Sequence, residues 1–104
     1  MELSNSEITD DITLSSNDAI KRCCIDGDII IESNSRNVIV ADCRIEGDII
    51  VRTGFDYITI INNICRNITH PGENGRIFIT NNVGGVVKKK NGLERAIKRM
   101  GNTC

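Results

Sequence analysis

The chain has 104 residues and a net charge of −1 at pH 7, with 19 Ile, 12 Asn and only three Phe or Tyr. This length accommodates one domain, which we expect to span residues 1–104. A net charge so close to zero excludes a strong attraction of the whole molecule to nucleic acid, and the shortage of aromatic residues argues against a core built around large rings.

The first residues, Met1-Glu2-Leu3-Ser4-Asn5, lack the basic and then apolar pattern of a secretory signal. No apolar run is long enough to cross a bilayer, so we expect no membrane contact. Five cysteines leave one without a partner, which does not fit the disulfide framework of a small secreted protein. We therefore predict an intracellular protein with reduced thiols, in which Cys104 is a free exposed thiol.

A regular repeat organises most of the chain. The segment 8–14 is followed by Ile25-Asp26-Gly27-Asp28-Ile29-Ile30-Ile31, which recurs as Ile45-Glu46-Gly47-Asp48-Ile49-Ile50-Val51. A second apolar run at 38–40 is matched at 58–60 and again at 77–79. A fixed period of about 20 residues, built on short runs of β-branched residues, is typical of a solenoid.

Small or polar residues recur at one position of this repeat, namely Asp10, Gly27, Gly47, Asn67 and Gly85. We expect corners there, because these residue types tolerate a positive φ. With three short strands in each period, the pattern resembles the right-handed parallel β-helix proteins. The resemblance implies an all-β fold of about four to five triangular coils over residues 8–87, stacked about 4.8 Å apart.

Alternation along each strand separates inward from outward side chains. We expect one interior stack of Ile29, Ile49 and Val87, and others along 38, 58 and 77 and along 40, 60 and 79. Cys23 and Cys43 occupy the same position of successive repeats and should be neighbours inside adjacent coils, as small apolar residues of the core. One His and no Cys-x-x-Cys sequence predict no metal site, and we expect no cofactor.

The pattern changes near the C-terminus. Leu93, Ala96, Ile97 and Met100 have the spacing of one apolar helical face, which predicts a short amphipathic α-helix over 92–100. Such a helix would cap the open end of the coils. The alternative is a contact with nucleic acid through a basic patch, which consists of Lys88, Lys89, Lys90, Arg95, Lys98 and Arg99.

Two apolar stripes are expected on the outside, one of Ile30 and Ile50 and the other of Ile39, Thr59 and Phe78. Exposed aliphatic stripes indicate either a partner surface or the ordinary apolar surface of a small domain. Acidic side chains are also expected to stack outside, as Asp11, Asp28 and Asp48 in one ladder and Asp26 and Glu46 in another. Whether such ladders hold an ion is left open by the sequence, which lacks the glycine-rich repeat of calcium-loaded β-rolls.

These patterns favour a non-catalytic solenoid that binds another protein or itself as a homo-oligomer. The style of the sequence suggests a viral or mobile-element accessory protein. A second hypothesis is a module that binds or cleaves polysaccharide through Asp42, Arg44 and Arg66. The few aromatic residues and the short stack of coils argue against that hypothesis and against an enzyme in general.

Overall fold

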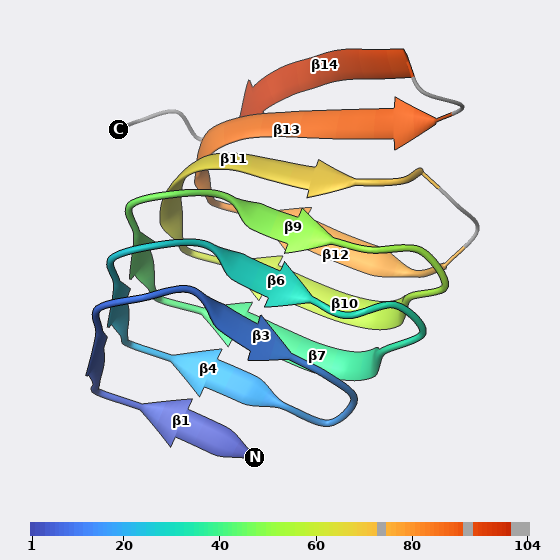
Figure 1. The fold of residues 1–104 in the computed structure, drawn as a ribbon. Helices are drawn as coiled ribbons and strands as arrows, with labels where there is room; N and C mark the ends of the chain where they lie inside the picture. Colours follow the sequence, from blue (N-terminus) through green and yellow to red (C-terminus); the bar gives the residue numbers. More distant parts are fainter. Residues whose placement is uncertain (73–74, 91–92, 101–104) are drawn as a thin grey trace.

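The structure is a computed structural model that describes residues 1–72, 75–90 and 93–100, with side chains described as far as residue 86. Its strands follow one another around three faces (Figure 1). The first face has five parallel strands, in the order β1 (Glu2–Ser4), β4 (Ala19–Lys21), β7 (Arg36–Ala41), β10 (Asp56–Ile61) and β12 (Ile77–Thr80).

The other two faces carry the remaining strands. The second face has β2 (Glu7–Ile8), β5 (Cys24–Ile25) and β8 (Arg44–Ile45), and the third has β3 (Ile12–Leu14), β6 (Ile29–Ile31) and β9 (Ile49–Val51). Strand β11 (Ile64–His70) pairs with both β8 and β9, and β13 (Val83–Lys90) pairs with β11 in parallel. The chain therefore makes a parallel β-solenoid of about four turns, and its described residues are all-β.

The register of the strands reproduces the repeat of the sequence. Ile29 pairs with Ile49 and Ile31 with Val51, so each residue lies beside its counterpart in the next repeat. On the first face, Ile58 pairs with Val38 on one side and with Ile77 on the other. The coils are therefore stacked as the spacing predicted, although they begin at β1 rather than at residue 8.

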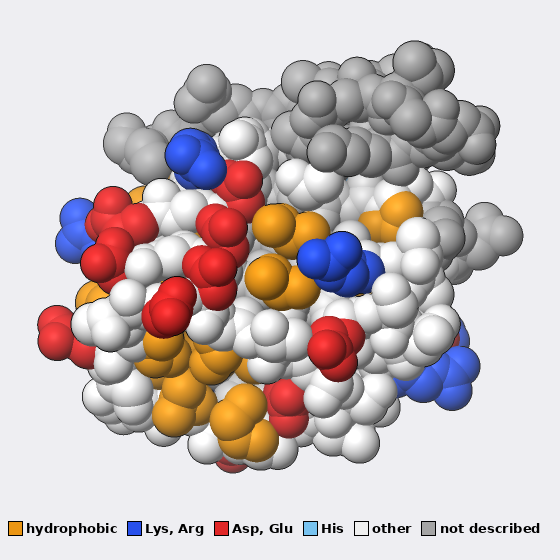
Figure 2. Space-filling view, in the orientation of Figure 1, with side chains coloured by type: hydrophobic (Ala, Val, Ile, Leu, Met, Phe, Trp, Pro, Cys, Tyr) orange, Lys and Arg blue, Asp and Glu red, His pale blue; other side chains and the backbone are white. Residues whose placement is uncertain are grey.

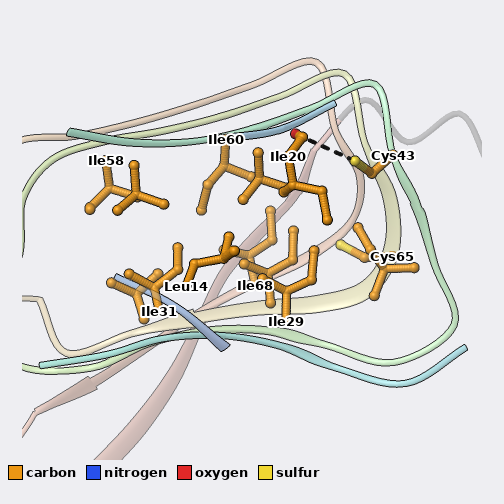
Figure 3. Packing of buried hydrophobic residues seen from close by; sticks show 14 of the residues in the cluster. Leu14, Ile20, Ile29, Ile31, Cys43, Ile58, Ile60, Cys65 and Ile68 are labelled. Atoms are coloured by element: carbon orange, nitrogen blue, oxygen red, sulfur yellow. Dashed lines mark hydrogen bonds between the residues drawn. The ribbon is translucent and has the colours of Figure 1, made fainter. Parts of the chain in front are cut away.

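The core is a set of aliphatic stacks inside the three faces (Figure 3). The predicted stack of Ile29, Ile49 and Val87 is wrong in its last member, because Ile49 pairs with Ile68 and Ile68 with Val86. The last two steps along this stack are each shorter in sequence than the step from Ile29 to Ile49, and this moves the inward position from 87 to 86. The largest fully buried side chains are Leu14, Ile20, Ile25, Ile29, Ile31, Val38, Val40, Ile49, Ile58, Ile60, Asn63 and Ile68.

A column of left-handed residues forms the corner that follows the first face. Its members have φ between 53° and 57° and are Asn5, Arg22, Asp42, Asn62 and Asn81. The predicted corner glycines have another role, because neither Gly27 nor Gly47 has a positive φ among the residues described. A Cβ at Gly27 would lie 2.6 Å from Asp11 Oδ1 and 2.9 Å from the carbonyl carbon of Asp10. These glycines are needed for close packing between coils.

A polar ladder runs inside the core beside that corner. Asn63 is 1% exposed and Asn82 is fully buried. The Nδ2 of Asn63 donates to Val40 O and to Asn82 Oδ1, and its Oδ1 accepts from the backbone N–H of Cys43 at 2.9 Å. In the next coils towards the N-terminus, Cys43 and Cys23 occupy the equivalent position and are buried, as predicted. Burial raises the pKa of the Cys43 thiol.

The predicted C-terminal helix over 92–100 is wrong. Leu93–Met100 is strand β14, which pairs antiparallel with β13. Lys90 is opposite Leu93, so only Asn91 and Gly92 connect the two strands, and Asn-Gly is the strongest short signal for a β-hairpin. A strand satisfies the open edge of β13 by backbone hydrogen bonds, which a helix cannot do.

Candidate interaction surface

The first predicted stripe lies on the third face. Ile30 and Ile50 pair with each other in β6 and β9, and they are flanked by Thr13 and Thr69. Both isoleucines are half-buried. Figure 2 shows hydrophobic side chains over these two strands, with acidic side chains gathered beside them.

Two shallow hollows border this stripe, with volumes of about 420 and 270 Å³. Ile30 lines the first and Ile50 the second, and both hollows are lined by Ser33 and Arg52. The stripe is therefore an apolar strip with Glu32, Ser33 and Arg52 at its edge, and these side chains form a polar rim of the kind found around protein interfaces.

The second predicted stripe lies on the first face and is more exposed at its end. Ile39 pairs with Thr59, and Thr59 with Phe78. Ile39 and Thr59 are half-buried, whereas Phe78 is 52% exposed. Tyr57, two residues before Thr59 on β10, is 45% exposed and was missed by the sequence analysis. Two of the three aromatic side chains of the chain are thus exposed on neighbouring strands.

Arg76 organises this region. Its Nη2 is 2.7 Å from Asp56 Oδ2 and its Nε is 3.0 Å from Asp56 Oδ1, which makes a two-point ion pair between adjacent coils. Its Nη1 donates to the Tyr57 hydroxyl at 2.7 Å, and its guanidinium carbon lies 3.9 Å from the centre of the Tyr57 ring. The hydrogen bonds from Arg76 hold the pKa of the Asp56 carboxyl well below its usual range.

Tyr57 has a φ of 57°, an uncommon conformation for an aromatic residue that costs roughly 1–2 kcal/mol. Asn17 and Asn37 occupy the equivalent positions of the preceding coils, also with positive φ. The fourth coil therefore accepts backbone strain to place an aromatic ring where the other coils have Asn. We call Tyr57, Arg76, Phe78, Ile39 and Thr59 the aromatic patch.

The first acidic ladder is held together by backbone hydrogen bonds. The backbone N–H of Asp28 donates to Asp11 Oδ1 at 2.7 Å, and that of Asp48 donates to Asp28 Oδ1 at 2.8 Å. At the end of the ladder, Arg66 Nε is 3.2 Å from Asp48 Oδ1. The ladder therefore ties successive coils together, and Arg66 supplies the opposite charge.

The second acidic ladder borders a hollow of about 390 Å³ on the second face, where Asp26 and Glu46 are both exposed. Cys24 and Arg44 line the same hollow. Among the residues that the structure describes, no group of three or more His, Cys, Asp or Glu side chains has an arrangement that could hold a metal ion.

The residues of the polysaccharide hypothesis lie in three separate columns. Asp42 is in the left-handed corner, and Arg44 is on β8, paired with Cys24 and Ile64. Arg66 is on β11, where it is bound to Asp48. All three side chains are exposed, and the hypothesis stays a prediction.

The basic patch lies in the hairpin of β13 and β14. Lys88 is opposite Arg95, and Gly85 is opposite Arg99, in an antiparallel register. The side chains of the patch, like Cys104, lie outside the described part of the molecule. Nucleic-acid contact therefore stays a prediction that rests on the sequence.

A comparison of the chain with models of protein families, with curated protein sequences and with solved structures found no match. Within the described residues, no helix is long and apolar enough to cross a membrane. The interpretation of the surface therefore rests on its geometry and chemistry.

Proposed function

We propose that this protein is a non-catalytic β-solenoid scaffold that binds another protein through the aromatic patch. The observation that carries the proposal is the exposure of Tyr57 and Phe78 on neighbouring strands of the first face, at 45% and 52%. In a chain with three aromatic residues, placing two of them in solvent costs hydrophobic stabilisation that the core would otherwise gain.

The composition of the patch supports this proposal. Tyr and Arg are enriched among the residues that contribute most to protein binding, and aromatic residues in general are enriched at interfaces. Arg76 is already held by Asp56 and Tyr57, so it loses little conformational freedom when a partner arrives. A flat sheet face with a rigid aromatic and cationic centre is suited to a protein surface of similar flatness.

The stripe of Ile30 and Ile50 is the second candidate surface. The observation in its favour is the pair of hollows along its edge, which a partner's side chains could enter. It ranks second because its isoleucines are half-buried and it contains no aromatic side chain.

The proposal is tested by affinity capture from the native cells, with the wild type, F78D and I64D as baits. Ile64 is a matched control, because it is 46% exposed but lies on the second face. We expect the F78D bait to capture at least about tenfold less of the bound protein than the wild-type bait captures. The I64D bait should capture as much as the wild type. Equal recovery by F78D and the wild type, with both baits folded by circular dichroism, would exclude the aromatic patch as the binding surface.

The variant I30K/I50K tests the second candidate surface in the same experiment.

A further inference from the structure

We propose that copies of this chain associate head to tail, with the first coil of one copy against β14 of the next. This association uses the two ends of the solenoid and is independent of the aromatic patch.

The first coil presents an open edge. Among the described residues, strands β1, β2 and β3 each pair on one side only, with β4, β5 and β6 of the second coil. Unpaired backbone groups of a parallel edge readily accept another strand. Lys or Pro on these strands would oppose such pairing, and residues 1–20 contain neither.

The same end exposes part of the core. Leu3, Ile8 and Ile12 pack on the buried cluster but are only half-buried, and Met1 is 59% exposed. Figure 2 shows hydrophobic side chains gathered over the first coil, near the N-terminus of Figure 1. A strand from another copy, packed on this end, would bury these side chains in the way that neighbouring coils bury the side chains of the inner coils.

The opposite end offers a strand edge of complementary charge. Strand β14 pairs only with β13, so its other edge is open in the described part of the chain. Residues 88–99 contain six Lys or Arg and one Glu, whereas residues 1–20 contain five Asp or Glu and no Lys or Arg. Like charges therefore oppose contacts between two first coils or between two hairpins, and opposite charges favour the contact of a first coil with a hairpin.

Strand direction also permits this contact. Strands β2 and β3 run in the same direction as β13, because they belong to the same parallel columns. Since β14 is antiparallel to β13, it would pair antiparallel with β2 and β3 of the next copy. A heterologous contact along the solenoid axis does not close on itself, so the product is a linear chain of copies.

The test is sedimentation velocity of the full chain at low and high salt, with the net charge nearly removed at one end or at both. We expect the wild type to form species of increasing mass with concentration and to dissociate in high salt, because the ends attract electrostatically. The first-coil variant E2K/E7K and the β14 variant R95E/R99E should each associate at least about tenfold more weakly.

Two combinations keep this test decisive. An equimolar mixture of E2K/E7K with R95E/R99E should associate again, because the unaltered first coil of R95E/R99E can meet the unaltered β14 of E2K/E7K. A single chain with all four substitutions should stay dissociated, because residues 1–20 then carry one net negative charge and residues 88–99 one net positive charge. A wild type that stays monomeric at low salt would overturn the proposal, and so would a mixture that associates no better than either variant alone although both are folded. Association that is abolished by F78D but not by E2K/E7K would assign self-contact to the aromatic patch instead.

Discussion

Asn63 is the residue on which the interior depends most strongly. It is 1% exposed, yet it satisfies backbone groups of the adjacent coil at Val40 and Cys43 and bonds to Asn82 on the other side. Buried polar groups that lose their partners cost far more than a hydrogen bond contributes on average. The ladder therefore links the coils that contain β7, β10 and β12 through the core.

We predict that N63A lowers the free energy of unfolding by about 2–5 kcal/mol, because it leaves a buried N–H and a buried carbonyl without partners and adds a cavity. Urea denaturation measures this loss. The control is N62G, in the exposed left-handed corner beside it, which should change stability by less than about 1 kcal/mol. A loss of less than about 0.5 kcal/mol in N63A would show that the ladder contributes little.

For single residues, the sequence predicted the positions within the repeat better than it predicted what the residues at those positions do. The corner glycines were correctly placed in the repeat, but Gly47 is required because a Cβ would overlap the Asp28 carboxylate and lie 2.8 Å from Gly27 O. The spacing of Asn63 and Asn82 could have predicted the ladder, because they occupy the position that Cys23 and Cys43 occupy in earlier repeats. The burial of Cys23 and Cys43 was predicted, but the burial of the two Asn residues was not, because Asn is usually at the surface.

Charged side chains gather at the contact between strands β10 and β12. Arg36 Nη2 lies 3.8 Å from Asp56 Oδ2, so two arginines face one carboxylate in the fourth coil. Asp56 and Tyr57 belong to β10 and Arg76 directly precedes β12, so this cluster holds β12 in register on β10.

We predict that the cluster stabilises the fold above about pH 4 and loses its effect in acid. The folded-state pKa of Asp56 is depressed, so its contribution is present above the unfolded pKa and is lost as the pH falls through the folded pKa. Thermal unfolding should show a wild-type advantage over D56N at pH 7 that shrinks as the pH falls below about 4. In an R76Q background, D56N should lose most of this pH-dependent effect. An advantage that grows in acid would contradict this account.

Strands with a strong repeat were predictable, and the final strand was not. The stacking of 38, 58 and 77 followed from spacing alone, because a period of about 20 residues leaves little freedom in register. The segment after Gly92 has apolar residues at helical spacing, but its place beside the open edge of β13 makes it a strand. The Asn-Gly pair at 91–92 was the signal that could have corrected the prediction.

The whole molecule combines a regular interior with surfaces of different chemistry. The first face carries the aromatic patch, the corner between the second and third faces carries the acidic ladder, and the two ends carry opposite charges. The interior was predictable because it repeats. The aromatic patch was only partly predictable, since Tyr57 departs from the Asn of its column and Arg76 joins it from the next coil.

If the chain acts by contacting another protein through the aromatic patch, as we propose, Phe78 lies at that contact. The most direct measurement places a photo-crosslinking phenylalanine analogue at Phe78, or at Ile64 as the matched position on the second face, and irradiates the native cells. We predict a discrete protein adduct at position 78 and none of that mass at position 64. The adduct mass distinguishes a second copy from another protein. Absence of an adduct at 78, or identical adducts at both positions, would contradict the claim.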